Sequence, residues 1–175
     1  PRLQALQATQ QFAPQWETLT DEFKTIATAV TQVRQSKALM AILLKVLAMG
    51  NYLNGTSARG GAYGFKMADL AKLVQVKSAD SNTTLLHYLA RCLLAGQPNV
   101  IDDLKEQLNA LPEAKDIPLA EKKAEIVKLA ASFQQAKTQL DACADDDALA
   151  PLLRTFCDSA QEQLAALQTE SAATE

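Results

Sequence analysis

The chain has 175 residues and a formal net charge of −3, and 48% of its residues are hydrophobic but only 5% aromatic. This length is enough for one core of ordinary size, and the scarcity of aromatic residues favours helices over sheets, so the composition predicts an all-α fold. The small negative charge argues against nucleic acid or an anionic membrane as a partner, and the longest apolar run, residues 38–44, is too short to insert into a bilayer.

The first long helix is predicted from an apolar pattern that alternates steps of three and four residues. Residues 3–12 are compatible with a helix, and Pro14 then either kinks this helix or begins a new one. The seam that follows consists of Trp16, Leu19, Phe23, Ile26, Val30 and Val33. Such a seam is typical of the core of a helical bundle, with an intermolecular coiled coil as the alternative.

The second predicted helix is apolar on nearly all sides. Ser36 is a candidate N-cap, and the apolar residues continue from Ala38 to Met49. A helix without a polar face belongs in the interior of a protein, so we expect the helix from Ser36 to Met49 to be the most buried element of the fold. It leads directly into a stretch that is rich in glycine.

A short helix and a polar connection follow the glycine-rich stretch. The helix covers Met67 to Val74, and we expect Leu70 and Leu73 to face inward. Lys77 lies among polar residues in the connection, so we expect its side chain to be exposed to solvent. A surface charge of this kind contributes little to folding, which favours a role in binding.

The next helix is predicted from Thr83 to Ala95, and Gly96 is a suitable residue to end it. Its candidate N-terminal caps are Ser78, Asp80 and Ser81. His87 is the only histidine of the chain and has no partner at metal-ligand or catalytic spacing, so we interpret it as a packed or surface ring. No catalytic set of residues is recognisable.

The C-terminal half predicts two long antiparallel helices. Pro98 is expected to begin a preceding helix, with Ile101, Leu104 and Leu108 on its inner face, and Pro112 and Pro118 mark a break. The next seam consists of Leu119, Ile126, Leu129, Phe133, Ala136, Leu140 and Cys143. The last consists of Leu149, Leu152, Leu153, Phe156, Ala160, Leu164 and Leu167, with Pro151 tolerated in the first turn. Between them, residues 145–147 are three aspartates that mark a turn and lack the spacing of a calcium loop.

Function is most easily sought between Gly50 and Tyr88, where five of the six glycines and all three tyrosines lie. Glycines gathered between two helical patterns indicate a shaped loop. A phosphate-binding loop would need Lys where Gly61 stands, and a dinucleotide fingerprint would need a preceding strand, so a nucleotide-dependent enzyme is disfavoured.

Four sequence blocks in this stretch resemble a known family. They are GNYLN at residues 50–54, GGAYGFK at 60–66, KSAD at 77–80 and TLLHYL at 84–89. In this order and at this spacing they resemble the post subdomain of the formin homology 2 domain. The family more often has Met in place of Leu53, a nearly volume-conserving change, and often Asp-Thr in place of residues 75–76.

The resemblance implies an architecture and a function. Residues 1–35 would be the end of the coiled-coil region, and residues 36–175 the post with returning long helices, in an elongated bundle. The family's lasso, linker and knob would be absent. Two complete domains form a ring, in which each lasso wraps the partner's post, and the ring caps and elongates the barbed end of actin filaments.

The resemblance also implies roles for single residues. The surface that accepts the lasso would be formed or supported by Gly50, Asn51, Leu53, Asn54, Gly61, Tyr63, Gly64 and Phe65. Lys77 would contact actin. From spacing alone, Asn51 and Asn54 are equally compatible with bracing their own loop and with binding a partner.

We therefore expect a cytoplasmic, cytoskeletal interaction module with actin as its partner and no cofactor, and not an enzyme. Profilin would bind flanking regions, and the abrupt start at Pro1, without a signal peptide, suggests a piece of a longer protein. The three cysteines, Cys92, Cys143 and Cys157, are expected to be buried free thiols in a reducing compartment. The alternative function is a helical scaffold for a partner other than actin.

Overall fold

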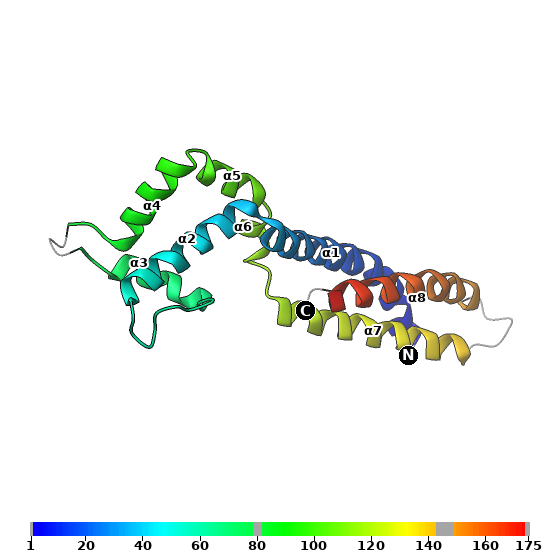
Figure 1. The fold of residues 1–175 in the computed structure, drawn as a ribbon. Helices are drawn as coiled ribbons and strands as arrows, with labels where there is room; N and C mark the ends of the chain where they lie inside the picture. Colours follow the sequence, from blue (N-terminus) through cyan, green and yellow to red (C-terminus); the bar gives the residue numbers. More distant parts are fainter. Residues whose placement is uncertain (1, 79–81, 143–148, 174–175) are drawn as a thin grey trace. The chain divides into compact units, whose positions relative to one another are not determined.

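The computed structural model describes residues 2–78, 82–142 and 149–173. Within these residues the protein is predominantly helical, with no strand and only one isolated antiparallel bridge, between Lys77 and Thr84. The predicted all-α fold is confirmed. The chain divides into two compact units (Figure 1). Unit 1 consists of residues 1–31 and 110–175, and unit 2 of residues 32–109.

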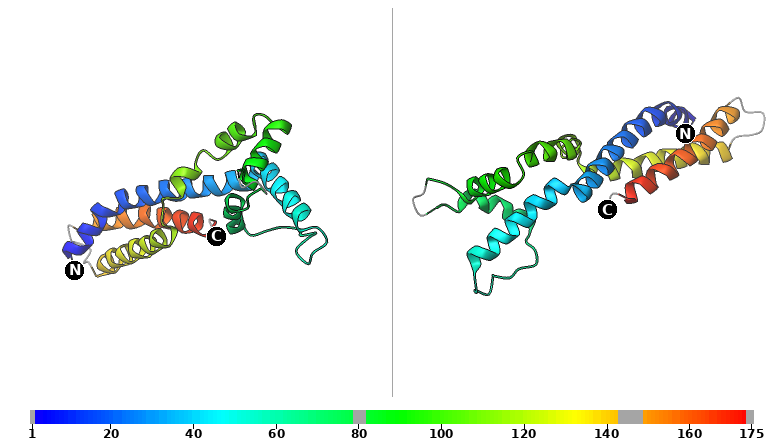
Figure 2. Two further views of the ribbon diagram at one scale, coloured as in Figure 1. Left: turned by 90° about the vertical axis from the view of Figure 1, so that its left-hand side faces the viewer. Right: turned by 45° about the horizontal axis from the view of Figure 1, so that its top comes forward.

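The described part of unit 1 is built from long helices and one short helix. They are α1 (Arg2–Gln35, of which residues 2–31 belong to unit 1), the short α6 (Leu111–Ala114), α7 (Leu119–Asp141) and α8 (Ala150–Ala173). The helices α7 and α8 pack side by side and run antiparallel, as predicted (Figures 1 and 2). Pro14 lies inside α1 and neither ends it nor begins a new helix.

The predicted seams form the core of unit 1. The largest group of buried side chains contains Phe12, Leu19, Phe23, Ile126, Leu129, Phe133, Cys157, Ala160, Leu164 and Leu167. Two seam predictions are wrong, because Val33 and Leu152 are exposed. Pro151 lies in the first turn of α8, where it was expected. Cys143 and the three aspartates at 145–147 fall outside the described residues.

A hydrogen bond and an ion pair connect α1 to α8 and α7 in unit 1. The Trp16 indole donates a hydrogen bond to the Gln163 carbonyl at 3.1 Å. The Lys122 ammonium group lies 2.9 Å from a carboxylate oxygen of Glu22 and 3.3 Å from one of Glu125. The hydrogen bond to Glu22 raises the pKa of Lys122, because it stabilises the charged ammonium form.

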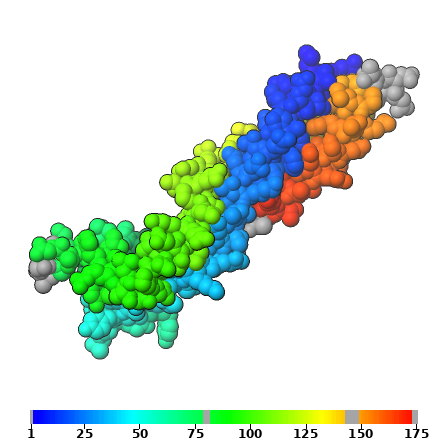
Figure 3. Space-filling view, turned by 90° about the horizontal axis from the view of Figure 1, so that it is seen from above, coloured from blue at the N-terminus to red at the C-terminus, as the bar shows by residue number. Residues whose placement is uncertain are grey.

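Within its described residues, unit 2 contains the end of α1 (residues 32–35) and five further helical segments. They are α2 (Lys37–Asn54), the 3-10 helix η1 (Met67–Ala71), α3 (Lys72–Gln75), α4 (Leu85–Gly96) and α5 (Val100–Gln107). Their buried residues are Ala38, Val46, Leu89, Leu93 and Val100. In Figure 3, α4 and α5 (green) lie on the face of unit 2 that is turned to the viewer.

Most local predictions for unit 2 hold. Ser36 caps α2, and its side chain accepts a hydrogen bond from the Leu39 amide at 3.0 Å. Leu70 and Leu73 pack against the buried cluster, although the predicted single helix is divided into η1 and α3. The helix expected from Pro98 begins at Val100 instead, and Val100 is buried there while Ile101 is exposed.

The prediction that the helix from Ser36 to Met49 is the most buried element is wrong. In α2 only Ala38 and Val46 are buried, whereas Met40 is 56% and Leu44 58% exposed. Unit 2 covers one face of α2 with α4 and α5, and no described part of this unit covers the opposite face. The helix is therefore apolar on both sides but buried on one.

No single helix among the described residues is long and apolar enough to cross a membrane. Only α1 and α2 taken together meet the requirement of length and composition, and they are separated by a bend at Ser36.

The N-terminus of α4 is capped by a residue that the sequence did not single out. Thr84 accepts a hydrogen bond from the His87 amide, and the Thr84 amide donates to Nδ1 of His87 at 3.2 Å. This reciprocal pair is a capping box, in which His87 takes the place usually held by Glu or Gln. Of the three predicted caps, Ser78 bonds Thr83 instead, and Asp80 and Ser81 fall outside the described residues.

Replacing Thr84 with alanine is expected to lower the free energy of unfolding by about 1 kcal/mol, because the first turn of α4 loses its side-chain acceptor. Thr84→Ser keeps the hydroxyl and serves as the matched control, with a loss well under half of that value. Urea denaturation followed by circular dichroism measures both variants. Equal stability of Thr84→Ala and the unmodified chain would show that the cap contributes nothing.

Candidate functional site

The loop between α2 and η1 is braced by the asparagines that the sequence motif contains. The side-chain amide of Asn51 donates to the Ala62 carbonyl at 2.9 Å, and its oxygen accepts from the Ala62 amide at 2.8 Å. Asn54 donates a longer bond of 3.4 Å to the Arg59 carbonyl. Both side chains therefore brace the backbone of their own loop, which is one of the two roles that their spacing in the sequence allowed.

Three glycines of the loop meet distinct backbone requirements. Gly55 ends α2 with φ of 51°, and Gly61 has φ of 68°, values that residues with a side chain rarely adopt. Gly60 has a different reason, because a Cβ atom at this position would overlap the carbonyl oxygen of Gly55. Gly50 and Gly64, the other two glycines of the motif, face open space.

The aromatic residues of the loop separate into an exposed and a half-buried side chain. Tyr63 is fully exposed, at 102%, and Leu53 is exposed as well. Phe65 is half-buried and packs against the buried cluster of unit 2. The Phe65 ring therefore anchors the end of the loop, whereas Tyr63 stays in contact with solvent.

Lys77 lies in a tight antiparallel connection between α3 and α4. The Leu85 amide donates to the Val76 carbonyl at 2.8 Å, and the Ser78 amide donates to the Thr83 carbonyl at 2.9 Å. These bonds fix the backbone on both sides of Lys77, whose side chain is exposed as predicted. The lysine is thus presented to solvent from a well-held backbone.

A groove of about 610 Å³ on unit 2 is lined by Leu53 and Lys77, but not by the loop residues from Gly55 to Phe65. One wall is the C-terminal half of α2, with Lys45, Met49 and Tyr52, and the other is α4, with Tyr88 and Cys92. The connection that carries Lys77 closes one end. The volume lies in the range of ordinary ligand sites, but the groove is open along its length and mostly apolar.

Tyr88 and Cys92 interact on the α4 wall. The neighbouring Cys92 side chain raises the pKa of Tyr88, and Tyr52 acts in the same direction. Tyr88 therefore stays a neutral hydroxyl at physiological pH. The groove offers apolar surface, hydroxyl groups and ammonium groups, but no pair of groups suited to acid–base catalysis.

The two units differ in charge, which the net value of −3 conceals. Unit 2 has nine lysines and arginines but only five aspartates and glutamates, a formal charge of +4. Unit 1 has eight basic and fifteen acidic residues, a formal charge of −7. Of the acidic residues in unit 2, Asp69 already pairs with Lys72 at 2.7 Å, and this hydrogen bond lowers the pKa of Asp69.

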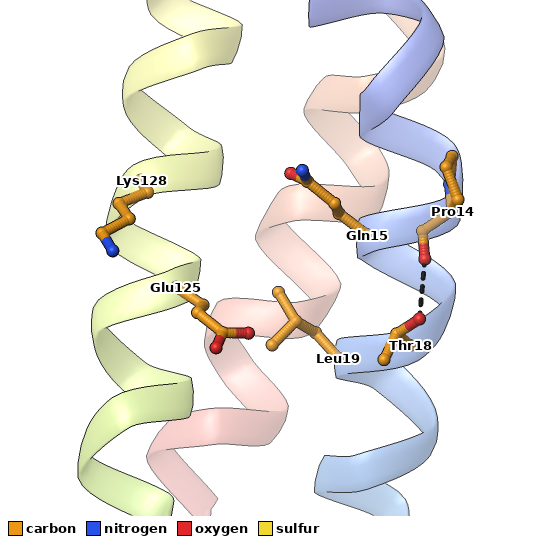
Figure 4. A pocket seen from close by; sticks show the side chains of 6 residues that line it. All are labelled: Pro14, Gln15, Thr18, Leu19, Glu125 and Lys128. Atoms are coloured by element: carbon orange, nitrogen blue, oxygen red, sulfur yellow. Dashed lines mark hydrogen bonds between the residues drawn. The ribbon is translucent and has the colours of Figure 1, made fainter.

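A second hollow, of about 400 Å³, lies in unit 1 between α1 and α7 (Figure 4). Gln15 and Leu19 of α1 line it together with Glu125 and Lys128 of α7. Thr18 donates a hydrogen bond to the Pro14 carbonyl at 2.9 Å, so its hydroxyl is engaged within α1. The residues that line this hollow include no histidine and no cysteine.

Sequence reasoning located the loop and Lys77 but missed the α2–α4 groove. Tyr52 and Tyr88 were noted only as part of a tyrosine-rich stretch, although they lie on opposite walls. The available signal was that α2 is apolar on more sides than one neighbouring helix can cover. Within the described residues, no three His, Cys, Asp or Glu side chains come together as metal ligands would.

Comparisons with known proteins agree on one family. The family model described as "Formin Homology 2 Domain" matches residues 1–175. Disheveled-associated activator of morphogenesis 1 of Mus musculus is 36% identical over 141 residues, which cover 80% of this chain and 13% of that protein. Formin-like protein 20 of Arabidopsis thaliana is 34% identical over 158 residues, covering 88% of this chain and 10% of that protein.

A third relative, protein diaphanous homolog 3 of Homo sapiens, is 30% identical over 141 residues, covering 81% of this chain and 12% of that protein. The chain thus spans only about an eighth or less of the length of these three curated relatives. The aligned part of each relative is a small portion of a larger protein.

Proposed function

Because the chain belongs to the formin homology 2 family, we propose that it is part of a factor that nucleates actin filaments and elongates their barbed ends. It acts as a binding module in the cytoplasm, at the cytoskeleton, and not as an enzyme. The observation that carries the proposal is the braced loop from Gly55 to Phe65, which presents Tyr63 on the same unit as the exposed Lys77.

The loop serves as the surface that accepts the lasso of a second subunit. Leu53 and Tyr63 supply exposed apolar area, and a lasso with aromatic side chains would cover it. Asn51, Asn54 and Gly61 support this surface by holding the backbone in shape, and Phe65 anchors the end of the loop. No other atom lies near the position that a Cβ atom would take at Gly50 or Gly64, so a second chain can approach the backbone closely there.

Lys77 serves as a contact to actin. Its side chain makes no ion pair within the described part of the chain, and its backbone is held on both sides. An unpaired ammonium group on a fixed backbone suits a carboxylate on a partner surface, and it loses little conformational freedom of the main chain on binding.

Replacing Lys77 with aspartate in the full-length protein is expected to slow actin assembly at least about tenfold, because reversal of charge places like charges at the contact. Pyrene-actin polymerisation measures this rate. The thermal unfolding temperature should be almost unchanged, since the side chain is exposed.

The matched control for this substitution is Lys105→Asp, which changes an exposed lysine on α5 of the same unit. It should leave actin assembly intact. A large loss of stability in Lys77→Asp would instead make this lysine structural. Unchanged assembly by Lys77→Asp would favour the second candidate function, a helical scaffold that binds a partner other than actin through the apolar α2–α4 groove.

A further inference from the structure

Asn54 is the only asparagine of the chain that is followed by glycine. The other four asparagines precede Tyr52, Thr83, Val100 and Ala110. The backbone nitrogen of the residue after an asparagine can attack the side-chain carbonyl carbon of that asparagine, and a side chain on the attacking residue hinders this approach. Gly55 has no side chain, and glycine adopts the backbone conformations that the attack requires more readily than other residues do. The pair of Asn54 and Gly55 is therefore the most reactive asparagine sequence of the chain.

The structure presents the Asn54 side chain to solvent at the end of a helix. Asn54 is the last residue of α2, and Gly55 follows as its C-cap with φ of 51°. The side-chain amide of Asn54 donates a hydrogen bond of 3.4 Å to the Arg59 carbonyl. Asn51, by contrast, makes two bonds of 2.9 and 2.8 Å to Ala62. Because the terminal turns of helices also fray, Asn54 is held less firmly than Asn51.

One backbone hydrogen bond controls access to the reaction. The Gly55 amide donates to the Asn51 carbonyl at 3.0 Å, so its N–H group is engaged in the last turn of α2. This bond must break before the Gly55 nitrogen can reach Cγ of Asn54. Local opening of the last turn of α2 therefore sets the rate, and a loosened loop should react faster than a braced one.

We propose that Asn54 is a site of spontaneous deamidation, with water as the co-reactant. A new bond forms between the Gly55 nitrogen and Cγ of Asn54, and the bond from Cγ to the side-chain nitrogen breaks. The side-chain nitrogen leaves as ammonia and takes up the proton that the Gly55 nitrogen gives up. Water then opens the resulting five-membered succinimide ring at one of its two carbonyls. The product is either aspartate or isoaspartate, and nothing is oxidised or reduced.

Both products loosen the loop. The aspartate carboxylate only accepts hydrogen bonds, so it cannot donate to the Arg59 carbonyl as the Asn54 amide does. Isoaspartate adds a carbon atom to the main chain directly before Gly55, whose carbonyl group lies so close to Gly60 that no Cβ atom fits there. The inference goes beyond the proposed function, which gives Asn54 a supporting role but no chemical change. A loss of lasso binding after deamidation rests on the proposed function, whereas the covalent change does not.

The test incubates the 175-residue chain for several weeks at neutral pH and body temperature in water enriched in oxygen-18. Peptic digestion in acid, which keeps further deamidation slow, is followed by tandem mass spectrometry. Residue 54 should gain about 3 Da, because a heavy hydroxyl group from water replaces the side-chain NH₂ group. The rate constant should be at least about tenfold higher than that of each other asparagine. A sample digested before incubation gives the amount that forms during handling.

Three variants connect the reaction with the loop. Asn54→Gln should show no gain at residue 54, because its longer side chain would have to close a six-membered ring, which forms far more slowly. Gly60→Ala, which forces the loop open, should raise the Asn54 rate several-fold, and its matched control Gly64→Ala should leave that rate unchanged. The Ala62 amide should exchange at least about tenfold faster in the deamidated fraction than in fresh chain. In Asn54→Gln, incubation should leave this exchange as it is in the fresh variant.

Three results would overturn the inference. They are conversion of Asn54 no faster than that of the other asparagines, an equal Asn54 rate in Gly60→Ala and in the unmodified chain, and slow exchange of the Ala62 amide in the deamidated fraction. Titration of the lasso peptide uses fresh chain and is a separate measurement. If the peptide does not bind fresh chain, the proposed function fails and the deamidation site stands. If Asn54 resists deamidation, binding of the peptide to fresh chain still supports the proposed function.

Discussion

Replacing Phe23 with alanine is expected to lower the free energy of unfolding of unit 1 by about 3–5 kcal/mol. Phe23 is fully buried and belongs to the main core of that unit, where side chains of α1, α7 and α8 meet. Truncation removes the transfer free energy of the ring and leaves a cavity that the three helices close only in part. This is a large share of the roughly 5–15 kcal/mol by which domains are stable.

The measurement is urea denaturation followed by tryptophan fluorescence. Trp16 is the only tryptophan, and its indole is bonded to the Gln163 carbonyl within unit 1, so its emission reports on this unit. Val127→Ala on α7 is the matched control, since Val127 is 68% exposed, and it should change stability by less than about 0.5 kcal/mol. If both variants unfold at the same urea concentration, Phe23 does not belong to a packed core.

The long helices were predictable because their apolar seams are covered by the chain itself. Leu19 and Phe23 of α1 pack with Ile126 and Leu129 of α7 in one buried cluster. The residues that recur at steps of three and four in the sequence are therefore the ones that are buried in the structure. The antiparallel packing of α7 and α8 follows from two such seams joined by a short connection.

The burial of α2 could not be predicted from its sequence. Its apolar pattern predicts that all faces are buried, but the described residues of this chain bury only one of them. A helix that is apolar on all sides is predicted to be buried on every face, but its sequence does not show whether the same chain or another molecule buries each face. Unit 2 covers the face with Ala38 and Val46, and the face with Leu44 and Tyr52 stays exposed. The prediction failed because the described part of unit 2 leaves this second apolar face of α2 uncovered.

The site was predictable in its positions but not in its geometry. The motif identified Asn51, Gly61 and Lys77, whereas the bonds of Asn51 to Ala62 join residues eleven apart through a loop whose shape no spacing rule contains. The cap of α4 was missed for a different reason. A histidine three residues after Thr84 does not match the usual capping box with Glu or Gln.

Replacing Gly60 with alanine is expected to disrupt the loop from Gly55 to Phe65 and to weaken its binding of the lasso at least about tenfold. A Cβ atom at position 60 would overlap the carbonyl oxygen of Gly55, so two backbone segments must move apart. The Gly60 amide also donates to the Ser57 carbonyl at 2.9 Å, and this bond would be lost with the movement. The substitution adds only one methyl group, but this group would collide with the backbone of Gly55. A backbone segment cannot move aside as easily as the end of a flexible side chain.

Hydrogen exchange and peptide titration measure this effect. The Ala62 amide, which donates to Asn51 at 2.8 Å, should exchange at least about tenfold faster in Gly60→Ala, because the brace between loop and helix opens. A synthetic lasso peptide from this protein should bind the unmodified chain saturably, and binding should fall by at least about tenfold in Gly60→Ala and in Asn54→Asp. Urea denaturation monitored by Trp16 should be unchanged, since unit 1 has its own core.

The matched control is Gly64→Ala, because a Cβ atom at that position meets no other atom. This variant should keep the slow exchange of the Ala62 amide, and any loss of lasso binding in it would come from direct contact with the peptide and not from loop distortion. Gly60→Ala with unaltered exchange would mean that the close approach to Gly55 does not shape the loop. Distorted exchange with full lasso affinity would mean that the loop from Gly55 to Phe65 is not the surface that accepts the lasso.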